Sequence, residues 1–319
     1  MEMKRKIIVI VDIEGIIGIR KICDINQNVR LAYRELKMLI IEVQKYGWQD
    51  VYICNIHDDG TCLEKEVLEG MGYIFVNGLN ELCNKLEDFG YGMMVGFHGK
   101  RDSGGMFDHT FRDDIRSVEC NGKEIGEVGM FYKWLSEKGV QVVFISGEGY
   151  FADEIDNKNC IIHSMISFGR YNEERERFLT RLRKAMVIMK GSLINNKPEE
   201  EKTEVRLKLC SEDVYYIMKG NECYKVKTDY IYFESVDKFF REILEFCKEL
   251  NKINRIIYKN NLEFISHIKE NGYTQDELQE KIGGYLNYNV EYLNYKERNR
   301  IATELGMKYE DICIGKEMF

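Results

Sequence analysis

Long apolar runs are missing from this sequence, since no stretch reaches the roughly 20 uncharged apolar residues that a helix needs to cross a bilayer. The start, Met1 to Lys6, leads straight into a strand-like run and lacks the pattern of a signal peptide. We therefore expect no membrane span and an intracellular location.

Three motifs that would identify common classes of protein are also absent. The sequence contains no G-x-x-x-x-G-K-[ST] and no G-x-S-x-G, which argues against a P-loop nucleotide site and a serine hydrolase of that type. None of the ten cysteines forms a C-x-x-C pair, and several lie in apolar runs, where a reduced thiol behaves as a small hydrophobic side chain. This usage predicts a reducing compartment, the cytoplasm.

Basic residues are outnumbered by acidic ones, 46 to 54, which gives a net charge of −8. This balance makes a nucleic-acid backbone an unfavourable main partner, but it is compatible with a cation site. The length of 319 residues and a hydrophobic fraction of 44% are sufficient for a full core in two or three packed units.

Strand-like and helix-like segments alternate through the first half of the chain. Helices are expected at about 29–46, closed by Gly47, and at about 126–138. The short apolar runs that we predict to be strands are 7–11, 51–54, 73–76, 93–96 and 141–145. This alternation predicts a mainly parallel three-layer α/β/α sheet domain over residues 1–195.

The second half predicts a smaller α/β unit and a helical extension. A charged helix at about 172–193 is followed by a linker that contains the only proline, Pro198. Strands are expected at 204–209, 214–218 and 224–233, and a helix at 236–250, so that residues 196–254 form the second unit. Residues 255–319 are expected to be a separate set of short helices.

The first predicted strand ends in an acid pair, Asp12 and Glu14, followed by Gly15. Residues i and i+2 of an extended chain point to the same face, so the two carboxylates project together and repel unless a cation or proton lies between them. Open α/β folds place ligands at this edge of the sheet. Taken alone, the pair is more simply explained as a solvated strand end, so it does not establish a site.

Histidines follow two further strands at the same predicted edge. His57 comes after the second strand and His98 after the fourth, although the sequence has only five histidines. A single histidine at such a position is usually a hydrogen-bonded loop residue, and only the convergence with the acid pair indicates a metal site. Mixed carboxylate and imidazole ligands suit zinc, manganese or a similar ion.

Two further candidates have simple structural explanations. His109 follows a glycine-rich loop, 102–105, which can bring a histidine against a substrate or be an ordinary surface loop. Glu127 lies in the first turn of the predicted helix at 126–138, where a carboxylate can simply complement the helix dipole.

Six motifs in the same order resemble those of the M55 family of metallopeptidases, strongly to about residue 155 and loosely to about 250. They are Val11-Asp12-Ile13-Glu14-Gly15, Asn55-Ile56-His57, Gly96-Phe97-His98-Gly99, Asp108-His109-Thr110, residues 121–129 and Ser146-Gly147-Glu148. Six motifs in register are far more specific than any one of them.

The resemblance implies a two-zinc site, with manganese or another divalent ion as a possible substitute. Its ligands would be Asp12, Glu14, His57, His98 and Glu127, and His109 occupies the position of the catalytic histidine. It also implies a ring-like homo-oligomer, a pentamer or a decamer of stacked pentamers. A short peptide or amide, plausibly with an N-terminal D-amino acid, is the implied substrate.

Three positions depart from the family pattern. Ile10 replaces the usual serine before the acid pair, Asn55 replaces an aspartate, and Gly149 replaces an acid after Glu148. None is a matched ligand, so these departures affect the expected substrate and the tuning of the metals.

Two other signals compete with this interpretation. Residues 147–152 fit G-x-G-x-x-A, a dinucleotide-binding pattern, but no acidic residue follows at the expected distance of about 20 residues. The extension resembles a degenerate helix-turn-helix, but residues 282–295 contain no Lys or Arg, which favours protein contact over DNA binding.

The sequence thus predicts a metal-dependent aminopeptidase or amidohydrolase. The alternative is a regulatory or scaffold protein that keeps the peptidase fold and uses residues 255–319 to bind a partner.

Overall fold

The computed structural model describes residues 6–20, 25–112, 115–155, 160–165, 171–191, 203–209, 214–219, 222–227 and 231–246. The chain divides into two compact units: residues 1–208 with 230–242, and residues 209–229 with 243–319. The predicted boundaries at 195/196 and 254/255, the linker at Pro198 and the helical extension all lie outside the described residues. The domain division therefore stays a prediction.

A six-stranded sheet in the order β3-β2-β1-β4-β7-β8 forms the centre of the first unit. All five strand pairings within it are parallel. Its strands are β1 (Ile7–Val11), β2 (Val51–Asn55), β3 (Ile74–Val76), β4 (Tyr91–Phe97), β7 (Gln141–Glu148) and β8 (Ile161–Met165). The strands β1, β4 and β7 are fully buried along their length, which explains their continuous apolar sequence.

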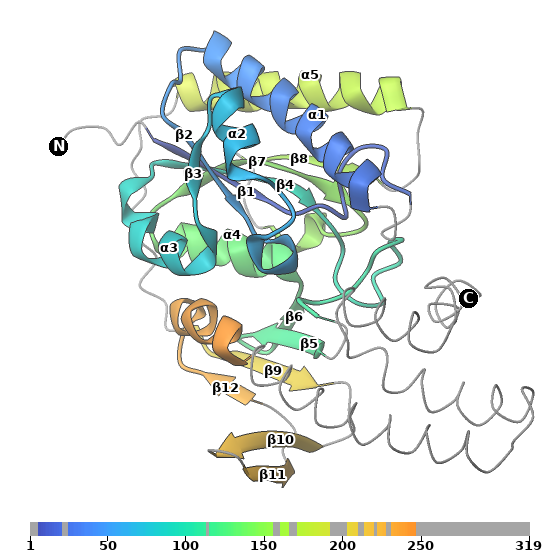
Figure 1. Ribbon diagram of the computed structural model, residues 1–319, viewed down its shortest axis with the longest axis vertical. Coiled ribbons are helices and arrows are strands. Elements are labelled where there is room, and N and C mark those ends of the chain that lie inside the picture. Colours follow the sequence, from blue (N-terminus) through green and yellow to red (C-terminus); the bar gives the residue numbers. More distant parts are fainter. Residues whose placement is uncertain are drawn as a thin grey trace, which may run out of the picture. The chain divides into compact units, whose positions relative to one another are not determined.

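Helices cover both faces of this sheet, with α1 and α5 on one face and α3 and α4 on the other (Figure 1). Their bounds are α1 (Ile25–Lys45), α2 (Lys65–Met71), α3 (Gly78–Lys85), α4 (Glu127–Glu137) and α5 (Tyr171–Gly191). Short 3-10 turns span His57–Gly60, Leu86–Asp88 and Ala152–Glu154. The predicted three-layer α/β/α architecture is confirmed.

A second sheet in the first unit has the order β12-β9-β5-β6. It contains β5 (Ile115–Cys120), β6 (Lys123–Ile125), β9 (Val205–Leu209) and β12 (Ile231–Phe233). A helix at 236–246 follows β12 and packs against α4. The rings of Trp134 and Phe240 stack with centroids 4.3 Å apart, and Trp134 Nε1 donates a hydrogen bond to Asp237 Oδ1 at 3.1 Å.

The single strand predicted at 224–233 is wrong, because the chain forms two strands there. One is β11 (Glu222–Lys227), which pairs antiparallel with β10 (Val214–Lys219), and the other is β12. Aromatic and β-branched residues occur on both sides of Lys227, Thr228 and Asp229, so their frequency alone did not divide the segment. None of the helices in the described segments is long and apolar enough to span a membrane.

Candidate metal centre

The carboxyl ends of β1, β2 and β4 bring the acid pair and two histidines together. Because these strands are parallel neighbours in register, Val11 lies beside both Asn55 and Val95, and the residues that follow each strand meet at one edge. The sequence predicted this convergence from the position of each residue after its strand. Glu127, the first residue of α4, completes the group.

Glycine at position 15 lets the backbone after β1 turn tightly against β4. Its N–H donates to Gly96 O at 2.7 Å, and a Cβ atom at Gly15 would overlap the carbonyl oxygen of Phe97. Gly96 adopts a φ of +76°, a conformation that L side chains rarely adopt. The glycine after the acid pair is therefore a requirement of packing, and it fixes where Asp12 and Glu14 point.

The two carboxylate oxygens of Asp12 face different histidines. Oδ1 lies 3.1 Å from His57 Nδ1, and Oδ2 lies 3.5 Å from His98 Nε2. Glu14 Oε2 is 2.8 Å from His57 Nδ1, while Glu127 Oε1 is 3.3 Å from His98 Nε2. The side chains thus form two clusters, each with a histidine and a second carboxylate, and Asp12 belongs to both.

Each of these clusters brings three potential ligand atoms within 4.8 Å of one another. The first comprises Asp12, Glu14 and His57, and the second Asp12, His98 and Glu127. A third triplet, Glu14, His98 and His109, meets the same limit. Imidazole nitrogens and carboxylate oxygens at this spacing are donors that fit zinc or a similar divalent ion.

His98 supports this fit because its inward nitrogen is unsatisfied. The ring is buried, with 1% of its surface exposed, and its Nδ1 lies 2.9 Å from Gly99 O. In the neutral ring with Nδ1 as the donor of that bond, the form that binds a cation, Nε2 carries a lone pair directed at the carboxylates of Asp12 and Glu127, with which it forms no hydrogen bond. A buried polar nitrogen is rarely left without a partner, and a cation would satisfy it.

The electrostatics of the buried cluster show how strongly its acids and histidines interact. Burial, together with the adjacent Glu14, raises the pKa of Asp12 to about 8. Burial opposes ionisation of Glu14 too, but the adjacent His57 outweighs it and lowers the Glu14 pKa well below its usual value. Burial alone would lower the pKa of His98, whereas the Glu127 carboxylate raises it to about 10. The carboxylates therefore favour positive charge between them.

His109 lies on the outer side of the cluster. Its Nε2 is 3.9 Å from both Glu14 Oε1 and Glu127 Oε1, and its ring stacks on His98. Its Nδ1 lies 2.9 Å from Phe107 O. The ring is only partly buried, with 20% of the side chain exposed, so it can meet a substrate.

Two acidic residues that the sequence did not assign to the site support its loops. Glu148, at the end of β7, accepts hydrogen bonds from Met106 N at 2.9 Å and Phe107 N at 3.5 Å. Glu154 accepts from the N–H groups of Gly126 at 2.7 Å and Gly129 at 3.0 Å, at the start of α4. Glu148 thus holds the loop of His109, and Glu154 holds the turn that carries Glu127. Glu148 lies in one of the six motifs, whereas nothing in its sequence context distinguishes Glu154 from a surface acid.

The dinucleotide pattern at residues 147–152 does not form a nucleotide site of the expected kind. The strand β7 ends at Glu148, and a 3-10 turn over Ala152–Glu154 follows in place of the helix whose N-terminus would hold a pyrophosphate. The helix-turn-helix resemblance lies outside the described residues.

Comparisons with known proteins identify the fold and the family. A solved structure described as the Zn-dependent D-aminopeptidase DppA from Bacillus subtilis, a self-compartmentalizing protease, matches with a TM-score of 0.60. The match has 16% sequence identity and covers 76% of this chain and 97% of that one. No curated protein sequence matches significantly. The model of the Peptidase_M55 family, described as D-aminopeptidase, matches residues 5–188, more than half of the sequence, and the chain therefore belongs to the M55 peptidase family.

Proposed function

We propose that this chain is a two-metal aminopeptidase that hydrolyses the N-terminal amide bond of short peptides, with D-amino acids as its preferred N-terminal residues. The observation that carries this proposal is the shared position of Asp12, whose two oxygens face His57 and His98 from opposite clusters. A carboxylate shared by both ions would hold them side by side, and Asp12 is our candidate for this role. The D-stereochemistry comes from the description of the family.

The five proposed ligands would divide into two sets. Glu14 and His57 would hold one ion, His98 and Glu127 the other, and Asp12 both. When bound, zinc lowers the pKa of a coordinated water from about 15.7 toward 7 and polarises a carbonyl oxygen. The complete donor set favours this enzymatic proposal over the regulatory or scaffold alternative.

The residues of the chain perform the remaining steps. His109, 3.9 Å from Glu14 and Glu127 and partly exposed, is placed to donate a proton to the leaving amine or a hydrogen bond to the developing oxyanion. If Nδ1 donates to Phe107 O, Nε2 is the atom that exchanges this proton. Glu127 also accepts from Phe111 N at 2.7 Å, which fixes its orientation beside His98.

The proposed assembly is a closed homo-oligomer, as the resemblance implies and as the self-compartmentalizing DppA suggests. Size-exclusion chromatography with light scattering on the full chain tests this directly. A mass near five or ten times 37.7 kDa supports a pentamer or decamer, and a monomer contradicts it.

The function is tested by assaying zinc-loaded protein on D- and L-aminoacyl amides and dipeptides, with zinc content measured on the same sample. We expect hydrolysis of D-aminoacyl substrates that a chelator abolishes. Glu127→Gln keeps an acceptor for Phe111 N–H but removes the charge, and it should lose bound zinc and activity together. Glu124→Gln, an exposed carboxylate three residues away, is the matched control and should keep both. Full zinc and activity in Glu127→Gln would contradict the assignment.

A further inference from the structure

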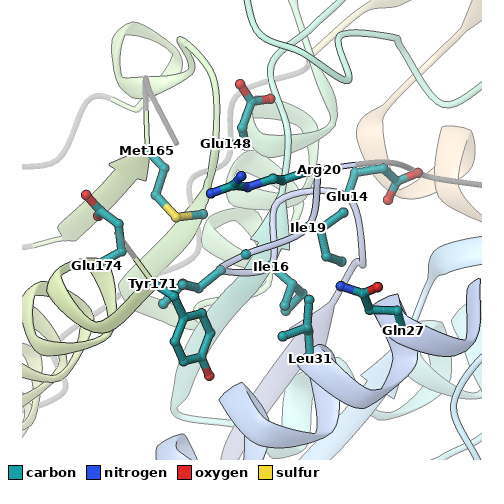
Figure 2. Close-up of a pocket in the computed structure, with 12 residues that line it drawn as sticks. Glu14, Ile16, Ile19, Arg20, Gln27, Leu31, Glu148, Met165, Tyr171 and Glu174 are labelled. Carbon is teal, nitrogen blue, oxygen red and sulfur yellow. The ribbon is translucent and has the colours of Figure 1, made fainter. Parts of the chain in front are cut away.

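A pocket of about 130 Å³ lies beside the proposed metal centre, and Glu14 is part of its wall. It lies between the loop after β1, the first turns of α1 and α5, and the ends of β7 and β8 (Figure 2). Glu14 thus belongs both to the wall of this pocket and to the proposed metal centre, so the two sites share a residue.

Buried aliphatic side chains form much of the lining. Ile16, Ile17 and Ile19 expose 1–2% of their surface, and Leu31 and Met165 expose 9%. Polar residues at the edge, Arg20 and Gln27, are exposed to solvent. An apolar lining with a polar edge is the usual construction of a pocket that takes an apolar group from an otherwise polar ligand.

The charges around the pocket disfavour an acidic occupant. Three acidic residues, Glu14, Glu148 and Glu174, are among its described lining residues, against one basic residue, Arg20. The hydrogen bonds of Glu148 to Met106 N, and of Glu174 to Arg177 Nη1 at 2.8 Å, hold these carboxylates in place. Among the described lining residues, a carboxylate entering the pocket would meet more negative than positive charge.

The volume sets the size of the occupant. An apolar cavity of about 150 Å³ in another protein accommodates benzene, so a pocket of this size suits a side chain of about four to six carbon atoms. An alanine methyl group would leave most of the lining without partner atoms, and the lining would then forgo the van der Waals attraction that a larger side chain supplies.

We propose that this pocket binds the side chain of the N-terminal residue of the substrate and selects aliphatic side chains of leucine or methionine size over small and acidic ones. This inference rests on the proposed aminopeptidase function. Each additional methylene group in such a pocket changes kcat/KM by about tenfold or more. A leucyl substrate should therefore exceed an alanyl one at least tenfold, and a glutamyl substrate should be at least tenfold poorer than the leucyl one.

The test measures kcat/KM of the zinc-loaded full chain on p-nitroanilides of D-Ala, D-Leu, D-Phe and D-Glu, with the L-series in parallel. Leu31→Phe fills part of the pocket and should lower the Leu-to-Ala ratio about tenfold. Ile41→Phe makes the same kind of enlargement on α1 at a side chain that is 45% exposed, outside the pocket, and should leave the ratio unchanged. Tyr171→Ala enlarges the pocket and should raise the Phe-to-Leu ratio.

The outcomes separate the two claims. If no substrate is hydrolysed by zinc-loaded protein, the proposed function fails, and the pocket assignment fails with it. If substrates are hydrolysed but the wild-type Leu-to-Ala ratio is within twofold of one, or Leu31→Phe changes both substrates equally, the pocket assignment alone is overturned. Thermal unfolding of each variant checks that it folds; if Leu31→Phe does not, Tyr171→Ala, at a partly exposed residue, decides the question.

Discussion

The imidazole rings of His98 and His109 stack with their centroids 4.0 Å apart and their planes 17° from parallel. His98 directly follows β4, while His109 follows a loop with glycines at 104 and 105. The inner ring is buried among carboxylates, and the outer ring is partly exposed beside them. The pair therefore combines a residue suited to hold a cation with one suited to act on a substrate.

This difference predicts different consequences for the two histidines. His109→Ala should keep its zinc and lose a factor of about 10² to 10⁴ in kcat, the usual range for a general acid or base. His98→Ala should lose zinc as well as activity, because its Nε2 faces two proposed ligands, Asp12 and Glu127. Elemental analysis and steady-state kinetics on the same samples distinguish the cases. Normal zinc content in His98→Ala would contradict its role as a ligand.

Glu148 should act as a positioning residue for His109. It accepts the N–H groups of Met106 and Phe107, and the carbonyl group of Phe107 contacts His109 Nδ1. Glu148→Ala should lower kcat about tenfold at unchanged zinc content, because the loop loses these two bonds. Glu148→Gln keeps an acceptor oxygen and should restore most of kcat, whereas equal losses in both variants would show that the charge itself is required. Asp153→Asn, at an exposed residue, serves as the control.

Glu35 should make the free energy of unfolding depend on pH. Burial raises the pKa of its carboxyl group from 4.5 to about 8, although Ile17 N donates to it at 2.8 Å. The unfolded chain loses this proton near pH 4.5 and the folded chain only near pH 8, so the group's contribution to stability is complete below pH 4.5 and is lost as pH rises to about 8.

The expected loss is on the order of 5 kcal/mol across that range, at about 1.4 kcal/mol per pKa unit. Glu35→Gln should remove the part of the pH dependence that Glu35 contributes, measured by urea unfolding at a series of pH values. Glu66→Gln, which changes an exposed carboxylate on α2, should keep it. If the free energy of unfolding of Glu35→Gln depends on pH in the same way as that of the wild type, the ionisation of Glu35 is not the cause of this dependence.

Removal of the proposed metal ions should destabilise the fold, since it would leave the buried carboxylates of Asp12, Glu14 and Glu127 without compensating charge. For a free zinc concentration about 1,000 times the Kd, binding contributes about 4 kcal/mol. With about 2–4 °C per kcal/mol for a unit of this size, chelation should lower Tm by on the order of 10 °C. Calorimetry with and without chelator measures the shift, and magnesium-loaded protein controls for ionic strength. An unchanged Tm would indicate that no structural cation is bound.

The sequence predicted the sheet and the convergence of residues better than the supporting contacts. Strands β1, β2 and β4 are buried, apolar and followed by polar residues, so their existence and the edge at which Asp12, His57 and His98 meet could be derived. Glu127 could be placed in the first turn of a helix, and the six motifs in register indicated the family before any structural comparison.

Tertiary contacts decided what the sequence could not show. Glu148 and Glu154 accept hydrogen bonds from backbone N–H groups that lie 25 to 42 residues away in the sequence. A local sequence pattern does not predict contacts over such separations. We did not predict the strand β5, because buried and exposed residues do not alternate strictly along Ile115–Cys120. Its antiparallel pairing with β6, which identifies it as a strand, is visible only in the folded chain. The pocket beside Glu14 combines α1, α5 and two strand ends, so it exists only in the folded chain.

Anomalous diffraction at the zinc edge from crystals of the zinc-loaded protein tests most directly whether Asp12 is shared by two cations. Two peaks, one beside Glu14 and His57 and the other beside His98 and Glu127, with one Asp12 oxygen bound to each, are the predicted result. A single peak, or peaks that lie away from Asp12, would contradict the two-metal account.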